Sequence, residues 1–191
     1  MIKFLVSKYG GMVMVFETKR LLLRPWCMTD LQSLYELAKD PHVGPPCGWN
    51  PHTDIEESKC VLEDILMNDY TFAVVLKETN EIVGDISLMP YCESRFPENE
   101  NQGEIGFWLG YPYWGQGYIP EACRRMIQYG FEELKLERIW CAHNLDNHNS
   151  KRVQEKSGFV FHHQDSYYAK ELDKRVEVMV NCIDNKINNE N

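Results

Sequence analysis

The sequence lacks the features that mark several large classes of protein. Its seven cysteines include no C-x-x-C pair, so neither a disulfide framework nor a zinc site is predicted, and a reducing, cytoplasmic environment is expected. No apolar run approaches the roughly 18 residues that cross a bilayer, so no membrane contact is expected. Positive charge is scarce, because 20 Lys and Arg residues stand against 29 Asp and Glu residues. The net charge of −9 argues against nucleic-acid binding and is compatible with a cationic substrate such as an amine.

Metal-ligand spacing is also missing among the six histidines. His162 and His163 are adjacent in a predicted strand, where neighbouring side chains point to opposite faces of the sheet. The sequence therefore predicts no metal site.

The composition that is present is ordinary for a globular protein. The chain has 191 residues, of which 43% are hydrophobic and 26% charged, and this length is enough to bury a sizeable core. We predict a single domain over residues 16–183, with an N-terminal tail or extension over 1–15 and a polar C-terminal tail over 184–191. Met12 and Met14 make an upstream start codon the alternative explanation of residues 1–15.

Apolar periodicity predicts alternating strands and helices. Strands are expected over residues 18–26, 70–76, 81–89, 103–109, 138–143, 159–165 and 174–183. Helices are expected over residues 29–39, 53–67, 120–135 and 147–157. Capping boxes at residues 29–32 and 53–56 start the first two helices. The order β-α-α-β-β-β-α-β-α-β-β indicates an α/β (α+β) fold, in which a mixed sheet carries helices on both faces.

The most informative stretch joins the strand at 103–109 to the helix at 120–135. Gly115 and Gly117 lie in the turn, and Pro120 suits the first helical position. A glycine turn before a helix directs N–H groups outward, which is typical of a phosphate site, although an ordinary tight turn is the alternative. A dinucleotide-binding loop fits poorly, since its third glycine would fall at Pro120, and the Gly-Lys-Ser/Thr of a P-loop is absent. A dehydrogenase or kinase is therefore disfavoured.

The segment Tyr-Trp-Gly-Gln-Gly-Tyr at residues 113–118 resembles motif A of the GCN5-related N-acetyltransferases (GNAT), in the RimJ/RimL-type branch that acetylates ribosomal-protein N-termini. Trp114 stands where the superfamily pattern has Gln or Arg, as is usual in this branch. Ile119 stands where Gly or Ala is usual. The resemblance extends over about residues 16–183. It implies the GNAT fold, with a central, mixed and mostly antiparallel sheet.

The resemblance also implies acetyl-CoA as co-substrate and an amine as acceptor. The pyrophosphate would lie on the turn and the pantetheine along the preceding strand, with further contacts at the start of the helix over 147–157. The implied cofactor-binding residues are Phe107, Trp108, Leu109, Trp114, Gly115, Gln116, Gly117, Tyr118, Ile119, Asn147, Ser150 and Lys151. Lys151 and Arg152 would neutralise phosphate, although solvated helix charges are an equal alternative.

Two residues are expected to move protons. Glu104 opens the strand beside the thioester and is the predicted base, provided that burial raises its pKa; a strand-end salt bridge is the alternative role. By family analogy, Asn147 binds the pantetheine and Ser150 protonates the leaving thiolate. Asn147 as a helix N-cap and Ser150 as a first-turn polar residue are the alternatives.

The acceptor is less well specified. A protein N-terminal amine is expected, and a small-molecule amine such as an amino sugar, an antibiotic or a polyamine is the alternative. Direct attack in a ternary complex is expected. An acyl-enzyme on Cys141 would be a minor alternative, because cysteine in an apolar strand is usually inert. A non-catalytic acyl-CoA sensor is the competing function, and a homodimer is left open. Aromatic residues that could line the acceptor pocket are Trp49, Tyr91, Tyr167 and Tyr168.

Overall fold

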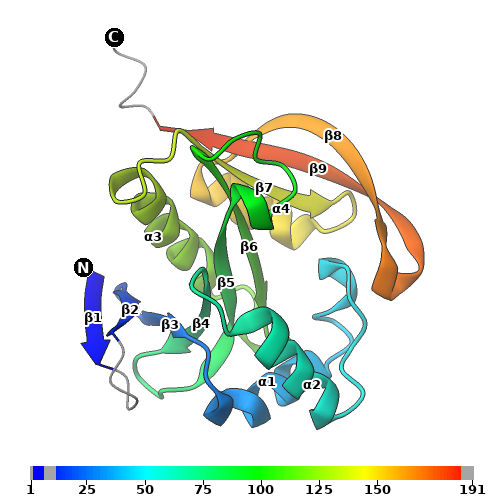
Figure 1. Ribbon diagram of the computed structural model, residues 1–191. Coiled ribbons are helices and arrows are strands. Elements are labelled where there is room, and N and C mark those ends of the chain that lie inside the picture. Colours follow the sequence, from blue (N-terminus) through cyan, green and yellow to red (C-terminus); the bar gives the residue numbers. More distant parts are fainter. Residues whose placement is uncertain (1, 7–11, 186–191) are drawn as a thin grey trace.

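The computed structural model describes residues 2–6 and 12–185, and over this part of the chain the strands form one nine-stranded sheet (Figure 1). The strands are β1 (Ile2–Val6), β2 (Met12–Glu17), β3 (Leu21–Pro25), β4 (Thr71–Leu76), β5 (Ile82–Pro90), β6 (Gln102–Leu109), β7 (Arg138–Asn144), β8 (Val160–Ala169) and β9 (Lys174–Asp184). The helices are α1 (Leu31–Ala38), α2 (Ile55–Val61), α3 (Tyr118–Glu132) and α4 (His148–Ser157). Leu62–Leu66 continues α2 as a π-helical turn. The short 3₁₀ turns are Met28–Asp30, Pro45–Cys47, Tyr91–Glu93, Tyr111–Tyr113 and Lys170–Leu172.

The sheet has the order β1-β2-β3-β4-β5-β6-β7-β9-β8, and its pairs are antiparallel except at one place. β6 and β7 are parallel and pair over only three residues each, Gln102–Glu104 with Arg138–Trp140. Beyond that point the two strands diverge while β6 remains paired with β5 as far as Leu109. The expected mixed, mostly antiparallel sheet is confirmed, and its single parallel pair opens a gap within the sheet.

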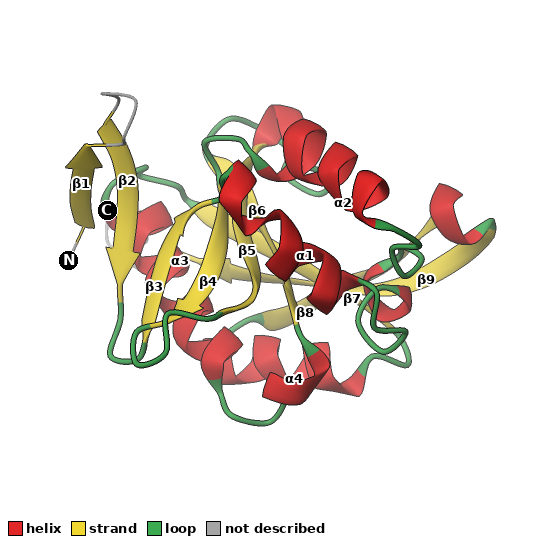
Figure 2. Cartoon of the chain, turned by 90° about the horizontal axis from the view of Figure 1, so that it is seen from below, coloured by secondary structure: helices red, strands yellow, loops and turns green. Residues whose placement is uncertain are grey.

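Helices cover both faces of the sheet, as the alternation of β4 shows. Phe72 of β4 packs in a core cluster with Ala122 and Met126 of α3. The next residue, Ala73, packs in a second cluster with Leu34 of α1 and with the helical turn that follows α2. Figure 2 shows α1 and α2 on one side of the strands and α3 and α4 on the other. None of the helices in the described ranges is long and apolar enough to cross a membrane.

The N-terminal region, expected as a tail or extension, contains two strands. β1 and β2 pair as an antiparallel hairpin, and β2 adds to the edge of the sheet through Phe16–Leu23 and Glu17–Leu22. Phe16 is fully buried in the main core. Residues 1 and 7–11 and the predicted C-terminal tail from residue 186 onward lie outside the described residues.

Both predicted capping boxes are wrong by one or more residues. The N-cap of α2 is Asp54, whose carboxylate accepts a hydrogen bond from the Glu57 N–H at 2.9 Å. Before α1, Asp30 forms a paired ion contact with Arg24 and accepts from the Cys27 N–H. Because this buried ion pair holds the chain in a 3₁₀ turn, α1 begins only at Leu31.

Candidate active site

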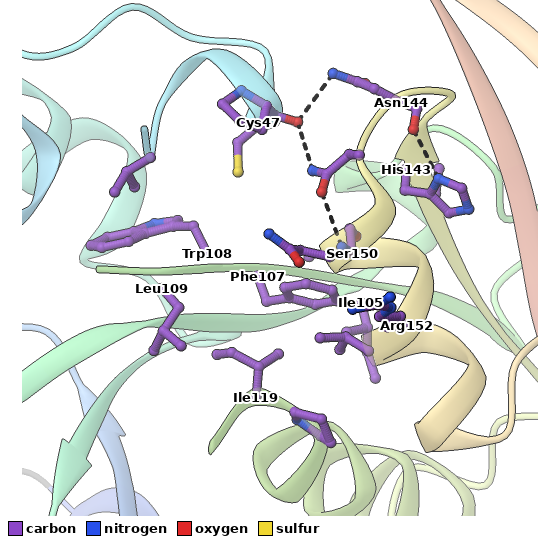
Figure 3. A pocket seen from close by; sticks show the side chains of 18 of the residues that line it. Cys47, Ile105, Phe107, Trp108, Leu109, Ile119, His143, Asn144, Ser150 and Arg152 are labelled. Atoms are coloured by element: carbon purple, nitrogen blue, oxygen red, sulfur yellow. Dashed lines mark hydrogen bonds between the residues drawn. The ribbon is translucent and has the colours of Figure 1, made fainter. Parts of the chain in front are cut away.

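A cavity of about 540 Å³ occupies the gap where β6 and β7 diverge (Figure 3). Residues 104–109 of β6 form one wall, and the end of β7 with the first turns of α4 forms another. The loop around Cys47 and the side chain of Tyr167 close one side of the cavity, and the turn with the start of α3 closes the far end. The predicted strand, turn and helix N-termini therefore converge on a single cavity.

The backbone of β6 offers hydrogen-bond donors to this cavity. The N–H of Gly110 donates to the Val83 carbonyl on β5 at 2.8 Å. Because successive backbone groups of a strand point to alternate sides, the N–H groups of Leu109 and Phe107 face the diverging side. The Leu109 carbonyl accepts from the Trp114 indole at 2.7 Å, which fastens the turn to the end of the strand. An extended ligand can therefore lie along β6 and hydrogen-bond to its main chain.

The turn after β6 has the geometry of an anion site. Gly115 and Gly117 both have φ of 77°, a left-handed conformation that favours glycine. A Cβ at Gly115 would stand in open space, so this side of the turn is open to a ligand. α3 begins at Tyr118, so Pro120 is its third residue and not its first as predicted. The N–H groups of Tyr118 and Ile119 have no acceptor within the helix, as at every helix N-terminus, and are available to phosphate.

Glu104 lies at the point where β6 and β7 part, and it lines the cavity. Its Oε2 accepts hydrogen bonds from the backbone N–H groups of Arg95 at 3.0 Å and Phe96 at 3.4 Å. Burial raises the pKa of Glu104, and these hydrogen bonds and the Arg95 charge only partly oppose the effect. The carboxylate thus has the two properties required of the predicted base, a place in the cavity and a raised pKa.

Asn147 caps α4 and also holds the loop opposite. Its side-chain oxygen accepts from the Ser150 N–H at 3.0 Å, and its amide nitrogen donates to the Pro46 carbonyl at 3.2 Å. Asn144 donates to the same carbonyl at 3.1 Å. The two hydrogen bonds to the Pro46 carbonyl are among the dashed lines in Figure 3. The capping role of Asn147 is confirmed, and the amide that the resemblance gives to pantetheine already has one protein acceptor.

Ser150 lines the cavity. Its oxygen accepts from the Gln154 side chain at 3.2 Å, and Gln154 in turn accepts from Asn181 at 2.6 Å. Because the hydroxyl oxygen is already an acceptor, its hydrogen is left to donate. This polarity suits the predicted role of proton donor to a thiolate.

The structure places one of the two predicted cations of α4 in the cavity. Lys151 lies outside the cavity lining and is 3.9 Å from Glu155. Arg152 lines the cavity, and so does Lys156, which the sequence did not single out. Helical spacing could have identified Lys156, because residues four apart, such as Arg152 and Lys156, share one face of a helix. Gln116 also lies outside the lining, and its side chain donates to the Pro112 carbonyl.

Cys47, and not Cys141, lines the cavity. Cys141 is 1% exposed and lies outside the cavity lining, and burial raises its pKa well above the usual range. These properties are those of a cysteine that packs in the core. Cys47, which the sequence did not single out, lines the cavity with its sulfur directed inward (Figure 3). Cys47 is exposed, and desolvation by the surrounding protein atoms together with the charge of Asp85 raises its pKa.

Of the four aromatic residues predicted around the acceptor, Tyr167 lines the cavity. Trp49 lies behind that wall and packs edge-to-face on Trp108 at 6.2 Å between ring centroids. Tyr91 and Tyr168 are exposed and lie outside the lining.

The adjacent histidines do not point to opposite faces. A register shift in β8 between Phe161 and His163 brings the rings of His162 and His163 to 5.0 Å between centroids. Within the ranges that the structure describes, no group of three or more His, Cys, Asp or Glu residues could hold a metal ion.

Known proteins share this architecture. A family model described as an acetyltransferase (GNAT) domain matches residues 20–160. An uncharacterized N-acetyltransferase of Bacillus licheniformis, p20, is 32% identical over 130 residues, which are 64% of this chain and 68% of that protein. The ribosomal-protein-serine acetyltransferase of Escherichia coli is 27% identical over 117 residues, 59% of this chain and 62% of that protein. A crystal structure of a GNAT-family acetyltransferase from Bacillus anthracis has a TM-score of 0.77 at 26% identity, covering 89% of this chain and 98% of that one.

The family match covers more than half of the chain and includes the parting strands, the glycine turn and the capped helix that form the cavity. The fold and the resemblance expected from residues 113–118 are both confirmed. The chain belongs to the GNAT family of N-acetyltransferases, and its relatives include a ribosomal-protein acetyltransferase.

Proposed function

We propose that this N-acetyltransferase takes its acetyl group from acetyl-CoA and transfers it by direct attack of a primary amine. The observation that carries the proposal is the β7-facing side of β6, which pairs with β7 no further than Glu104 and leads into a left-handed glycine turn at the N-terminus of α3. These two features fit the two parts of CoA, since the strand suits the amides of pantetheine and the turn suits its pyrophosphate. Arg152 and Lys156 add positive charge to the same cavity.

Different residues of the chain bind the cofactor and transfer protons. The N–H groups of Phe107 and Leu109 hold the extended arm of the cofactor. The bound thioester supplies the acetyl group and a thiolate leaving group. Glu104 accepts the proton of the attacking ammonium, directly or through water, and its raised pKa suits this role near neutral pH. Ser150 donates a proton on the leaving-group side.

For the acceptor, we propose a protein N-terminal amine. Support comes from the sequence similarity to an enzyme named for ribosomal-protein serine acetylation and from the RimJ/RimL-type segment at residues 113–118. The net charge of −9 favours a cationic acceptor over an anionic one. A small-molecule amine remains the alternative acceptor.

Binding and turnover test the proposal separately. Calorimetry should show that CoA thioesters bind more tightly than fragments that contain only pantetheine, and equal affinity for NADH or ATP would contradict the cofactor. A thiol-release assay should then compare peptides with free N-termini against amino sugars and polyamines. Higher kcat/KM on the peptides supports the N-terminal acceptor, and turnover of none of these amines would favour an acyl-CoA sensor. Intersecting initial-rate lines are expected for direct transfer, whereas parallel lines would indicate an acyl-enzyme.

A further inference from the structure

Arg20 connects the start of β3 to the glycine turn, about one hundred residues away in the chain. Its Nε donates to the Glu121 carboxylate at 2.7 Å, and its Nη1 donates to the Gln116 carbonyl at 2.9 Å. The guanidinium also lies over the Tyr118 ring at 4.5 Å. The residue's own backbone is anchored, since the Lys77 N–H donates to the Arg20 carbonyl at 2.9 Å. One side chain therefore holds the turn and the first turn of α3 against the sheet.

Glu121 reinforces this connection from the helix side. Its Oε1 accepts from the Thr18 hydroxyl at 2.6 Å and from the Arg20 backbone N–H at 2.8 Å. The Glu121 side chain is only 14% exposed, whereas that of Arg20 is 41% exposed. Partial burial would raise the Glu121 pKa, but the hydrogen bonds from Thr18 and Arg20 lower it overall. The carboxylate is therefore charged and fully engaged at neutral pH.

The bond to the Gln116 carbonyl has a consequence for the opposite side of the turn. In a trans peptide the C=O and the following N–H point in opposite directions. Since the Gln116 carbonyl points toward Arg20, the N–H of Gly117 points away from Arg20. An anion on the outer side of the turn then meets an N–H and not a carbonyl oxygen.

The turn needs such a restraint because its glycines permit more than one conformation. Turns that differ only by rotation of the central peptide are close in energy, and glycine is compatible with either orientation. A rotated Gln116–Gly117 peptide would present its carbonyl oxygen to the phosphate and repel it. Arg20 removes this alternative by binding the carbonyl with a charged donor, which is stronger than a neutral hydrogen bond.

We propose that Arg20 is a positioning residue for the cofactor pyrophosphate, because it holds the Gln116–Gly117 peptide with its N–H toward the anion. The inference rests on the proposed use of acetyl-CoA. It assigns a function to a side chain that acts through the main chain, and Arg20 lies outside the cavity lining.

The test compares Arg20→Gln and Arg20→Lys with the wild type. Calorimetry measures the affinity for acetyl-CoA and for acetyl-pantetheine, which lacks the pyrophosphate. In both variants acetyl-CoA affinity should fall about tenfold, the order expected for one hydrogen bond to a charged group. Acetyl-pantetheine affinity should not change. The KM for acetyl-CoA should rise in parallel, while kcat at saturating acetyl-CoA should stay within about twofold, because only uniform binding is lost.

Arg138→Gln is the matched control. Arg138 also binds a carboxylate through two nitrogens, at 2.6 and 3.2 Å from Asp184, and it also lies over an aromatic ring, that of Trp140. It has no contact with the turn, so acetyl-CoA affinity should remain at the wild-type value. If Arg20→Gln does not fold, Arg20→Lys tests the inference. Lysine keeps the positive charge beside Glu121 but lacks the second nitrogen that binds the Gln116 carbonyl.

Two results would overturn the inference. One is a folded Arg20 variant that binds acetyl-CoA as tightly as the wild type. The other is an equal loss of affinity for acetyl-CoA and acetyl-pantetheine, which would show a general structural effect. A wild-type protein that binds neither thioester would instead overturn the proposed function, so the two failures are distinguishable.

Discussion

Replacing Glu104 by Gln should remove the base while keeping the shape of the cavity. The Gln carbonyl oxygen can still accept from the Arg95 and Phe96 N–H groups, which in the wild type donate to Oε2. Within the described residues no hydrogen bond reaches Oε1, so this oxygen is the one available to an amine. In the variant an amide NH₂ takes its place, and a proton acceptor becomes a donor.

The expected loss follows from the protonation state of the acceptor. A protein N-terminal amine has a pKa of about 8, so roughly one molecule in ten is neutral at pH 7, whereas for an aliphatic amine, with a pKa of about 10, only about one in a thousand is neutral. A positioned base typically contributes at least about 10²-fold, so kcat/KM should fall by that factor, or about 2.7 kcal/mol of transition-state stabilisation. In the wild type, activity should also fall as pH drops through the raised Glu104 pKa, because the protonated carboxyl cannot accept a proton.

The measurement is kcat/KM for thiol release over a range of pH, for the wild type, Glu104→Gln and Glu100→Gln. The Glu104→Gln defect should shrink as pH rises, since solvent then deprotonates the amine, and acetyl-CoA affinity should stay the same. Glu100 is an exposed carboxylate in the loop before β6, and its variant controls for the loss of one negative charge. A wild-type pH profile in Glu104→Gln would refute the role of Glu104 as base.

Stability gives an independent check of the Glu104 environment. Burial raises the pKa of Glu104 in the folded state. The contribution of Glu104 to the free energy of unfolding is therefore present below its pKa in the unfolded state and is lost as pH rises through its pKa in the folded state. Glu104→Gln should therefore be at least as stable as the wild type at pH 7, by denaturant unfolding. A marked loss of stability would mean that the carboxylate has a structural role instead.

Three further predictions address other groups. Gly117→Val should abolish acetyl-CoA binding while the circular-dichroism spectrum stays native, because a β-branched residue disfavours the φ of 77° that the turn requires; unchanged affinity would make the loop an ordinary turn. Cys141→Ala should keep most of the activity, and mass spectrometry of the wild type with acetyl-CoA should find no acetylated Cys141; an acetylated peptide at this position would contradict direct transfer. Burial raises the pKa of Asp85 to about 7 although its carboxylate accepts from the Trp26 indole at 2.7 Å, so its stability contribution is present below about pH 4 and is lost as pH rises through 7. Asp85→Asn should therefore be more stable than the wild type at pH 8, by an amount on the order of a few kcal/mol, and less so at pH 5; equal stability of the two proteins at both pH values would show that Asp85 is not buried as described.

Local sequence signals predicted the elements that shape the cavity. The strand ending at Leu109, the glycine turn and the cap of α4 at Asn147 lie where spacing and turn chemistry indicate. Each of these features depends on residues within a few positions of one another. Glu104 was identified for the same reason, because it opens the strand that precedes the turn.

Features that depend on distant residues were missed. Arg20 binds Gln116 and Glu121, which lie 96 and 101 positions away, so no local pattern reveals the connection. The place of Lys156 in the cavity lining, and the exclusion of Lys151 from it, depend on the rotation of α4 about its axis, which packing decides. The N-terminal hairpin was missed because its pairing with β3 supplies the stability that the short strands do not have alone.

The parting of β6 and β7 after Glu104 also bears on how the protein can change over evolutionary time. The wall that it exposes, where we propose that the cofactor binds, is main chain, and it is available to a ligand whatever side chains the strand carries. The wall where we propose that the acceptor binds is instead built from side chains, which include Cys47 in the turn at Pro45–Cys47 and Tyr167 near the end of β8, and such surface segments accept substitutions with little effect on the core. On this proposal, substrate preference can change by mutation of a few residues of this wall while the cofactor site stays intact. A sheet of this kind allows related proteins to acquire different acceptors while the strands that bind the cofactor stay the same.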